Sequence, residues 1–566
     1  AYFPPLPLLP FSSLFSFFSF SLSFVAKSKR ADIKFRWLGS IVGDEQGIIR
    51  YRFQGEVLDS FYRNRIGLCV LHPAHCARLP CEITHVNDSV SAGYFPESIS
   101  PHQPFQNIRA ITHNAVPQWN VRIEMFGDTF EMEDQRNWTD ASFKTYSTPL
   151  HIPFPVCLEK GTRIDQSVEI ALCPSRDSYG LSHVSPNTAP TNKSLNESKI
   201  DMRREADTLI RIDWKAPVRR PKIGVLMPHD AMTVAEPVIQ ILHAIHLDHL
   251  RADLQLDQNG WQQRLAQAVL LAGQIDSQLE IAIFAETTND LPWRECIQRL
   301  RDLRSRIARL LVFHTSEKTT PSRLLDEAVA CLNDNGLELQ IVSGTDAYFA
   351  ELNRGRPPCV SGSCVCYSMN PQVHAFDNWS LAETLEALGA TVDSAFEYFG
   401  SDVVVSPISL RPRFNPNATI QMDRATELQA AIDPRQKTGF GAAWTVGVLA
   451  NLATHPRVRS LTLFEAFGPR GIVDNDSAEY PMTKVFSLIQ TSQEIYPATS
   501  TLPLSVVGFA TSATLVLGNL SNDQVEVDCG ELQSDCGEVE PVRLVLEPES
   551  IFVIPLPVVR SNKIVI

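Results

Sequence analysis

The sequence is short of basic side chains: 50 Lys and Arg stand against 64 Asp and Glu, which gives a formal net charge of −14. A nucleic acid or an anionic membrane surface attracts proteins through clustered Lys and Arg. The charge balance therefore argues against both kinds of partner and is compatible with a neutral sugar, a polyol or a small ester. Nothing in the sequence indicates an oligomeric state.

Several motifs are also missing. There is no G-x-S-x-G sequence, so an α/β-hydrolase serine nucleophile is not supported. No Rossmann or P-loop glycine pattern follows an expected strand, which argues against a nucleotide cofactor. The 12 cysteines form no zinc-type CxxC pair, and we interpret them as buried free thiols in a reducing cytoplasm. We expect no cofactor, and a divalent metal held by His and carboxylate side chains is the alternative.

Residues 1–26 contain an apolar run that Ser and Pro interrupt. A membrane-spanning helix needs about 20 mostly apolar residues. A secretory signal carries its basic residues before the apolar part, whereas KSKR follows it here. We therefore predict neither feature and expect residues 1–31 to lie outside the fold.

Short alternating runs such as IKFRWLGSIVG and VRIEMFG, separated by turn residues, dominate residues 32–215. This period of two is typical of antiparallel strands and predicts an N-terminal β-sandwich. Short strands return in residues 496–566, where we predict a small C-terminal β-domain.

Between these parts, in residues 216–495, apolar runs alternate with helical patterns. The strand candidates are KIGVLM, ADLQL, LEIAIFA, ARLLVFH, LELQIVSG, SCVCYSMN, DVVVSPISL and VRSLTLFEAFG. Eight strands with intervening helices over roughly 250 residues predict a (β/α)8 TIM-type barrel, and an open doubly wound sheet is the alternative.

The active sites of such barrels lie at the carboxyl ends of the strands. Polar residues at these expected positions are His229, Asp257, Glu286, Asp346, Asn370, His374, Arg411 and Glu465. Glu465 ends an apolar strand, where burial would raise its pKa and suit it to acid or base chemistry. An ion pair of Glu465 with Arg470 or Arg411 is the structural alternative. Glu286 could face Glu465 across a small substrate, as paired carboxylates do in glycosidases and water-activating hydrolases.

Several long strings resemble the D-apionate lactonase family: NRIGLCVLHP, ISPHQPFQNIRAITH, FEMEDQRNWTDASFKTY, GTDAYFAELNR, NPQVHAFDNWSLAETL, GAAWTVGVLA and LTLFEAFGPRG. The resemblance implies a cytoplasmic bacterial enzyme of apiose catabolism that opens D-apionolactone, a small sugar lactone, to D-apionate. It assigns no catalytic residues.

The stretch EMEDQRNWTDASFKTY, from Glu131 to Tyr146, combines charged, amide and aromatic side chains. We interpret it as a loop of the sandwich that leans over the barrel mouth. Trp138 would then stack on a sugar ring, while Asp134, Asn137 and Lys144 engage hydroxyl groups or the developing oxyanion. A polar network that joins the two domains is the alternative.

Lactone hydrolysis needs an activated water and a donor for the tetrahedral oxyanion. We predict that Glu465 or Glu286 activates water, while His374, His229 or Lys144 polarises the carbonyl group. Expected substrate contacts are Asp134, Asn137, Trp138, Asp257, Asp346, Asn370 and Arg411. A glycoside hydrolase with Glu286 and Glu465 as its carboxylate pair and a non-catalytic carbohydrate-binding protein are the alternative functions.

Overall fold

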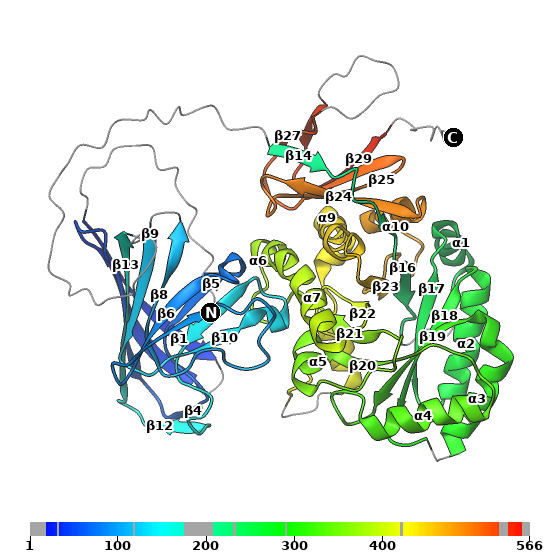
Figure 1. Cartoon of the computed structure of the whole chain (residues 1–566), viewed down its shortest axis with the longest axis horizontal. Coiled ribbons are helices and arrows are strands. Elements are labelled where there is room, and N and C mark those ends of the chain that lie inside the picture. The colour runs from blue at the N-terminus through cyan, green and yellow to red at the C-terminus, as the bar shows by residue number, and fades with distance from the viewer. Residues whose placement is uncertain are drawn as a thin grey trace.

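The computed structural model describes residues 19–30, 33–116, 119–174, 208–229, 234–288, 291–418, 423–530 and 542–556. They form an N-terminal β-domain, a closed parallel barrel with surrounding helices, and a C-terminal β-domain (Figure 1). The N-terminal domain stands to one side of the barrel, and the C-terminal domain lies above it in this view (Figure 1). The three predicted architectures are confirmed.

The N-terminal domain consists of antiparallel sheets. Its main sheet has the order β1-β2-β3-β13-β9-β8-β6-β7. Its strands are β1 (Phe20–Arg30), β2 (Ile33–Gly43), β3 (Ile49–Val57), β6 (Pro80–His85), β7 (Val90–Tyr94), β8 (Ile108–Val116), β9 (Trp119–Phe126) and β13 (Arg163–Pro174). Two smaller sheets comprise β10 (Glu131–Asp134), β11 (Ser142–Tyr146) and β5 (Cys69–Pro73), and β12 (Val156–Leu158) and β4 (Phe61–Arg63). Their inward side chains share one apolar core, to which Phe53, Ile83 and Phe143 belong.

The first strand corrects the expectation that the leader lies outside the fold. β1 pairs with β2 along its full length. Its apolar residues alternate with serine, which interrupts a membrane helix but fits the period of two of a strand. Phe24 and Phe20 lie opposite Gly39 and Gly43, where an added Cβ would come within 2.4 and 2.2 Å of their ring atoms. The bare glycines therefore leave room for aromatic rings to cover them across the strand pair. Residues 1–18 lie outside the described part of the chain.

The central barrel is closed, because β16 pairs with β17 on one side and with β23 on the other. This pairing excludes the open sheet and confirms all eight predicted strands. They are β16 (Lys222–Leu226), β17 (His249–Gln255), β18 (Gln278–Ala285), β19 (Ile307–His314), β20 (Ile341–Tyr348), β21 (Val365–Met369), β22 (Val403–Ile408) and β23 (Val458–Glu465).

Helices alternate with these strands along the chain, and most of them pack an apolar face against their neighbours. They are α1 (Glu236–Ile245), α2 (Trp261–Gln274), α3 (Leu291–Leu303), α4 (Ser322–Asp334), α5 (Phe349–Gly355), α6 (Asn378–Thr384), α7 (Leu388–Phe399), α8 (Arg424–Ala430), α9 (Gly439–Val448) and α10 (Pro481–Gln490). In α4, for example, Leu324, Leu325, Ala328 and Leu332 are buried at helical spacing, whereas α8 has no buried residue. Among the described residues, no helix is both long and apolar enough to cross a membrane.

The C-terminal sheet has the order β28-β27-β14-β24-β25-β26-β29, and β15 (Val218–Arg219) pairs with β24. Its strands are β14 (Thr208–Ile212), β24 (Glu494–Ser500), β25 (Val506–Thr511), β26 (Thr514–Asn519), β27 (Val525–Asp528), β28 (Arg543–Leu546) and β29 (Ser550–Pro555). β14 corrects the predicted boundary at residue 215, since it pairs with β24 and β27 rather than within the N-terminal domain. Its local alternation suits either sheet, so the sequence pattern could not distinguish them.

A buried ion pair fixes the polar stretch of the N-terminal domain. Arg136 donates from Nε and Nη2 to the two carboxylate oxygens of Asp134, at 2.9 and 2.7 Å. Its guanidinium also donates to the carbonyls of Pro96 and Glu97, at 2.8 and 3.0 Å. The side chains of Arg136 and Asp134 are only 3% and 0% exposed, so neither charge can be solvated if the other is removed.

We expect Arg136→Met to lower the free energy of unfolding by about 3–5 kcal/mol, because Asp134 is left as an unpaired buried charge. Urea denaturation followed by circular dichroism measures the loss. Arg52→Met is the matched control: its ion pair with Asp165 is on the exposed face of the sheet, and little change is expected there. Equal losses in the two variants would contradict the assignment.

Candidate active site

A guanidinium group lies at the centre of the barrel. Arg251 of β17 is fully buried. Its Nε donates to Asp253 Oδ1 at 2.7 Å, and its Nη2 donates to Asp346 Oδ1 in β20 at 2.5 Å. Its Nη1 donates to the carbonyl of Ser406 in β22 at 2.7 Å. One side chain therefore links β17, β20 and β22 beneath the carboxyl ends of the strands.

A second guanidinium group, that of Arg413, covers the first from the loop after β22. Its Nη2 donates to Asp346 at both the backbone oxygen, 2.8 Å, and Oδ1, 2.7 Å. Its Nη1 lies 3.8 Å from Asp253 Oδ2. Burial alone would raise the pKa of Asp253, but the charges of Arg251 and Arg413 outweigh it and hold that pKa below its usual value. The two aspartates thus lie between two arginines, and Asp253 is held in its ionised form.

Glu465 is the last residue of β23 and is 8% exposed. Arg470 donates to its Oε1 from Nε at 3.0 Å and from Nη2 at 2.9 Å. Burial raises the pKa of Glu465 above its ordinary value of 4.5, although the charges of Arg470, Arg264 and Arg413 oppose the shift. Both alternatives for this residue are therefore present together: it pairs with Arg470, and it is a carboxyl group with a raised pKa at the barrel mouth.

The backbone around Glu465 is irregular. Phe464 has a φ of 57°, in the left-handed region that non-glycine residues rarely adopt. The register between β16 and β23 shifts just before Leu226 pairs with Glu465. A bulge redirects the side chains that follow it, and such features are over-represented beside active sites. The backbone irregularity thus lies directly beside Glu465.

Among the buried donors that have no hydrogen-bond partner in the described part of the chain, Asn370 Nδ2 and Arg413 Nε lie near the mouth. Asn370 follows β21, is 2% exposed, and accepts through Oδ1 from the backbone N of Gln372 at 3.0 Å. An unsatisfied buried donor costs about 1–3 kcal/mol. Each is thus a position where a polar ligand atom or a water molecule would be stabilising.

Side chains from the N-terminal domain reach the rim of the mouth. His374, in the loop after β21, forms a 2.6 Å contact between its Nδ1 and Asp140 Oδ2. The rings of Trp138 and His374 meet edge to face with centroids 5.5 Å apart, and the guanidinium of Arg354 lies 4.9 Å from the centroid of Trp138. His374 is therefore positioned by two residues of another domain.

The same stretch also joins the two domains through hydrogen bonds. Asn353 of α5 donates to Asn137 Oδ1 at 2.9 Å, and Thr139 Oγ1 donates to the carbonyl of Asn370 at 2.9 Å. Asp134 accepts its bonds from Arg136 within the N-terminal domain. Asp134 and Asn137 thus take part in a polar network that includes the domain interface, and their expected contacts with substrate stay predictions.

The remaining predicted residues are dispersed. His229, Asp257 and Glu286 are exposed, and the carbonyl of His229 accepts from Arg264 at 3.1 Å. Arg411 donates to Asp433 at 3.2 Å in the loop region beyond β22. The described residues include no group of three or more His, Cys, Asp or Glu side chains that could hold a metal ion.

Comparison with known families identifies this architecture. A sequence model of the D-apionate lactonase N-terminal domain matches residues 17–175, and one of the D-apionate lactonase TIM barrel domain matches residues 223–502. The chain belongs to the D-apionate lactonase family. A protein named D-apionate lactonase from Brucella anthropi is 26% identical over 514 residues, which cover 86% of this chain and 80% of that protein.

Solved structures show more distant similarity. A GH30 endoxylanase from Clostridium papyrosolvens C71 is 10% identical, with a TM-score of 0.41 over 62% of this chain and 100% of its own. A family 39 glycoside hydrolase from Bacteroides cellulosilyticus WH2 is 8% identical, with a TM-score of 0.37 over 88% of this chain and 97% of its own. Similarity at these scores carries no information on the activity of this lactonase-family member.

Sequence reasoning missed three residues of the mouth: Arg251, Asp253 and Arg413. A signal was present in RADLQL, where Arg251 and Asp253 are two residues apart and so point to the same side of β17. Burying a charge on the inward face of a barrel strand costs free energy unless the charge is paired. Two opposite charges on that face therefore indicate a buried ion pair, which charges on the surface do not. Arg413 had no comparable signal, because its position depends on the path of a long loop.

Lys144 is placed apart from the barrel residues. Its Nζ forms a 2.9 Å ion pair with Glu133 and lies 5.3 Å from the ring centroid of Tyr146. Its strand, β11, pairs with β5 and β10 inside the N-terminal domain. These contacts favour a structural role for Lys144, and its predicted role at the oxyanion has no contact in the described residues to support it.

We therefore expect Lys144→Ala to leave kcat unchanged and Trp138→Ala to raise KM, because Trp138 contacts the rim residue His374, whereas Lys144 pairs with Glu133 inside the N-terminal domain. Steady-state kinetics on a lactone substrate, with the melting temperature of each variant, measure the difference. A large fall in kcat for Lys144→Ala at unchanged melting temperature would support the predicted role of Lys144 in stabilising the oxyanion. A lower melting temperature for Trp138→Ala with unchanged KM would assign Trp138 to the interface alone.

Proposed function

We propose that the protein hydrolyses a sugar-derived lactone, D-apionolactone to D-apionate in particular, at the mouth of its barrel. Membership of the D-apionate lactonase family supports the reaction class. The observation that carries the mechanism is Glu465, a nearly buried carboxyl group at the end of β23 that pairs with Arg470 and whose pKa burial raises. A cytoplasmic location and a role in apiose catabolism are part of the same proposal and depend on the family relationship.

In the proposed mechanism Glu465 takes a proton from a water molecule as the water oxygen attacks the lactone carbonyl carbon. The electron pair of the carbonyl bond moves to oxygen and forms a tetrahedral oxyanion. When the carbonyl re-forms, the ring C–O bond breaks, and the proton held by Glu465 passes to the leaving alkoxide. The product is an open-chain acid, which loses its proton to solvent and becomes the carboxylate.

The arginines of the mouth suit the charge that develops in this reaction. Arg413 commits Nη2 to Asp346, while its Nη1 lies 3.8 Å from Asp253, beyond hydrogen-bonding distance. The guanidinium is thus held in place by one nitrogen and has donors left for an oxyanion. Fixed donors of this kind stabilise a transition state without reorganising during the reaction.

Glu465→Gln is expected to lower kcat about 10²–10⁴-fold, the range that general-base catalysis contributes. Release of acid from D-apionolactone, recorded in a pH-stat, measures it, with aldonolactones and glycosides as a substrate panel. Glu286→Gln is the control, because Glu286 is exposed and a large loss is not expected there. Wild-type kcat in folded Glu465→Gln would remove Glu465 from the mechanism, and turnover of glycosides alone would replace the proposed reaction.

The pH dependence of kcat/KM follows from the same carboxyl group. Glu465 must be ionised to accept a proton, so activity falls as the pH drops through its pKa. Since burial raises that pKa, the acid limb of the profile is expected above pH 4.5. Arg470→Met removes a charge that lowers the pKa of Glu465 and is expected to move the acid limb to higher pH. An acid limb that stays in place in this variant would assign the titration to another group.

Arg413→Met is expected to reduce kcat about 10²–10³-fold, as the loss of one oxyanion donor does in other enzymes. Arg413→Lys keeps the charge but not the two-pronged geometry, and it should retain more activity than the Met variant. Steady-state kinetics separate kcat from KM in both variants. A change in KM alone would assign Arg413 to ground-state binding instead.

A further inference from the structure

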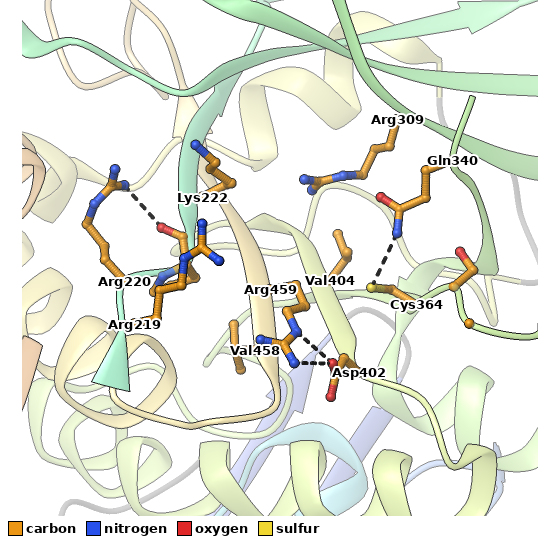
Figure 2. Close-up of a pocket in the computed structure, with 13 residues that line it drawn as sticks. Arg219, Arg220, Lys222, Arg309, Gln340, Cys364, Asp402, Val404, Val458 and Arg459 are labelled. Carbon is orange, nitrogen blue, oxygen red and sulfur yellow. Dashed lines mark hydrogen bonds and ion pairs between the residues drawn. The ribbon is translucent and has the colours of Figure 1, made fainter. Parts of the chain in front are cut away.

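A cavity of about 330 Å³ opens at the amino ends of the barrel strands, opposite the mouth. Its wall includes Lys222 at the start of β16, Val404 near the start of β22 and Val458 at the start of β23 (Figure 2). Five cationic side chains line it: Arg219, Arg220, Lys222, Arg309 and Arg459. Asp402 is the one carboxylate among the lining residues.

The positively charged side chains of the cavity outnumber the carboxylates that form ion pairs with them. Arg220 and Lys222 share Asp248, at 2.6 and 2.8 Å. Arg459 pairs with Asp402, at 2.5 Å.

Arg309 pairs with Glu280, at 3.0 Å, and Arg219 forms no ion pair with any described residue. Five positive groups are thus set against three carboxylates, in a chain whose net charge is −14. Uncompensated like charges repel one another, so the fold alone does not account for their concentration here.

Arg309 supplies the second observation. It is 6% exposed, and its Nη1 donates to Glu280 Oε2 at 3.0 Å, while its Nε has no partner in the described residues. Figure 2 shows its guanidinium extending toward the cavity from one side and that of Arg219 entering from the other. Because Glu280 fixes one edge of the Arg309 guanidinium, the group is oriented before any ligand arrives.

We propose that this cavity binds a small oxyanion, either a phosphate group or the carboxylate of a sugar acid. A planar guanidinium presents paired N–H donors that match the spacing of two oxygens on such a group, and two guanidinium groups here face one space. Gln340 Nε2 donates to Cys364 Sγ at 3.8 Å, and the second hydrogen of the same amide is a neutral donor for a hydroxyl group (Figure 2). The cavity volume lies within the range of small-ligand pockets.

The site does not depend on the proposed lactonase mechanism, because none of its lining residues belongs to the mouth. A neutral lactone has no group that the excess positive charge would select, whereas a phosphate or an opened sugar acid has one. We therefore expect the cavity to bind anionic metabolites in preference to the neutral lactone proposed as the substrate of the mouth.

Titration calorimetry of the full chain at low ionic strength tests the proposal, with inorganic phosphate in one arm and a sugar aldonate in the other. Wild type is expected to show saturable binding that weakens as chloride is added. Arg219→Glu should weaken binding at least about tenfold, because it replaces a charge-assisted donor by a carboxylate that repels the anion. Tighter binding of one anion identifies the preferred source of the oxyanion.

Arg211→Glu is the matched control. It is exposed on β14 of the C-terminal sheet, does not line the cavity, and makes the same change in net charge. It should change binding less than about twofold, and Arg413→Met, at the mouth, should leave phosphate binding intact. Arg309→Gln removes the buried guanidinium and should also weaken phosphate binding. If Arg309→Gln does not fold, Arg219→Glu still tests the proposal. Absence of saturable binding by wild type, or equal losses in Arg219→Glu and Arg211→Glu, overturns the proposal.

Discussion

The buried guanidinium of Arg251 is the constraint on which the interior of the barrel depends. Removing an arginine from water costs several kcal/mol, so its donors must be satisfied from within the fold. Asp253, Asp346 and the carbonyl of Ser406 meet that requirement from three different strands. The two carboxylates then attract Arg413, which brings a second cation over the first. The electrostatics of the mouth therefore follow from one buried charge.

The polar interior continues from Arg251 toward the opposite end of the barrel. Glu280 is fully buried in β18 and accepts hydrogen bonds from Thr462 at 2.9 Å and from Arg309 at 3.0 Å. Burial alone would raise the pKa of Glu280, but His249, Arg309 and Arg251 hold it below its usual value. Ser406 contacts both Glu280 and Arg251. Hydrogen-bonded groups thus connect the cationic cavity with the arginines of the mouth. Such continuity fixes the relative positions of both ends, because no member can move without leaving a buried charge unpaired.

The N-terminal domain contributes to the mouth through the position of one short stretch. A 3₁₀ helix, Gln135–Trp138, is anchored by the buried pair of Asp134 and Arg136 and packs beside α5 and α7. Its last residue and the loop after it contact His374 and Asn370. Interfaces between domains are commonly polar, and here that polarity also sets the rim residues that a substrate would meet.

The fold was largely predictable because its signals are local. Period-two alternation gave the antiparallel strands, and eight buried runs separated by helical patterns gave the barrel. The position of Glu465 at a strand end was also local, and the structure shows a buried carboxyl group there. The errors arose where strands pair with segments that the local sequence pattern does not identify. We interpreted the residues of β1 as an interrupted apolar leader, and we assigned β14 to the N-terminal domain.

The sequence by itself determined where most strands lie along the chain, the acidic balance and the presence of charged residues at strand ends. Only the tertiary structure decided which of these charges meet. Asp253 and Asp346 are 93 positions apart, yet both contact Arg251, and Asp140 meets His374 across two domains. Local pattern sets secondary structure because backbone hydrogen bonding and side-chain periodicity are short-range in sequence. The energy of a buried charge depends on every partner within a few ångströms, whatever its distance along the chain, and so it is fixed only when the chain has folded.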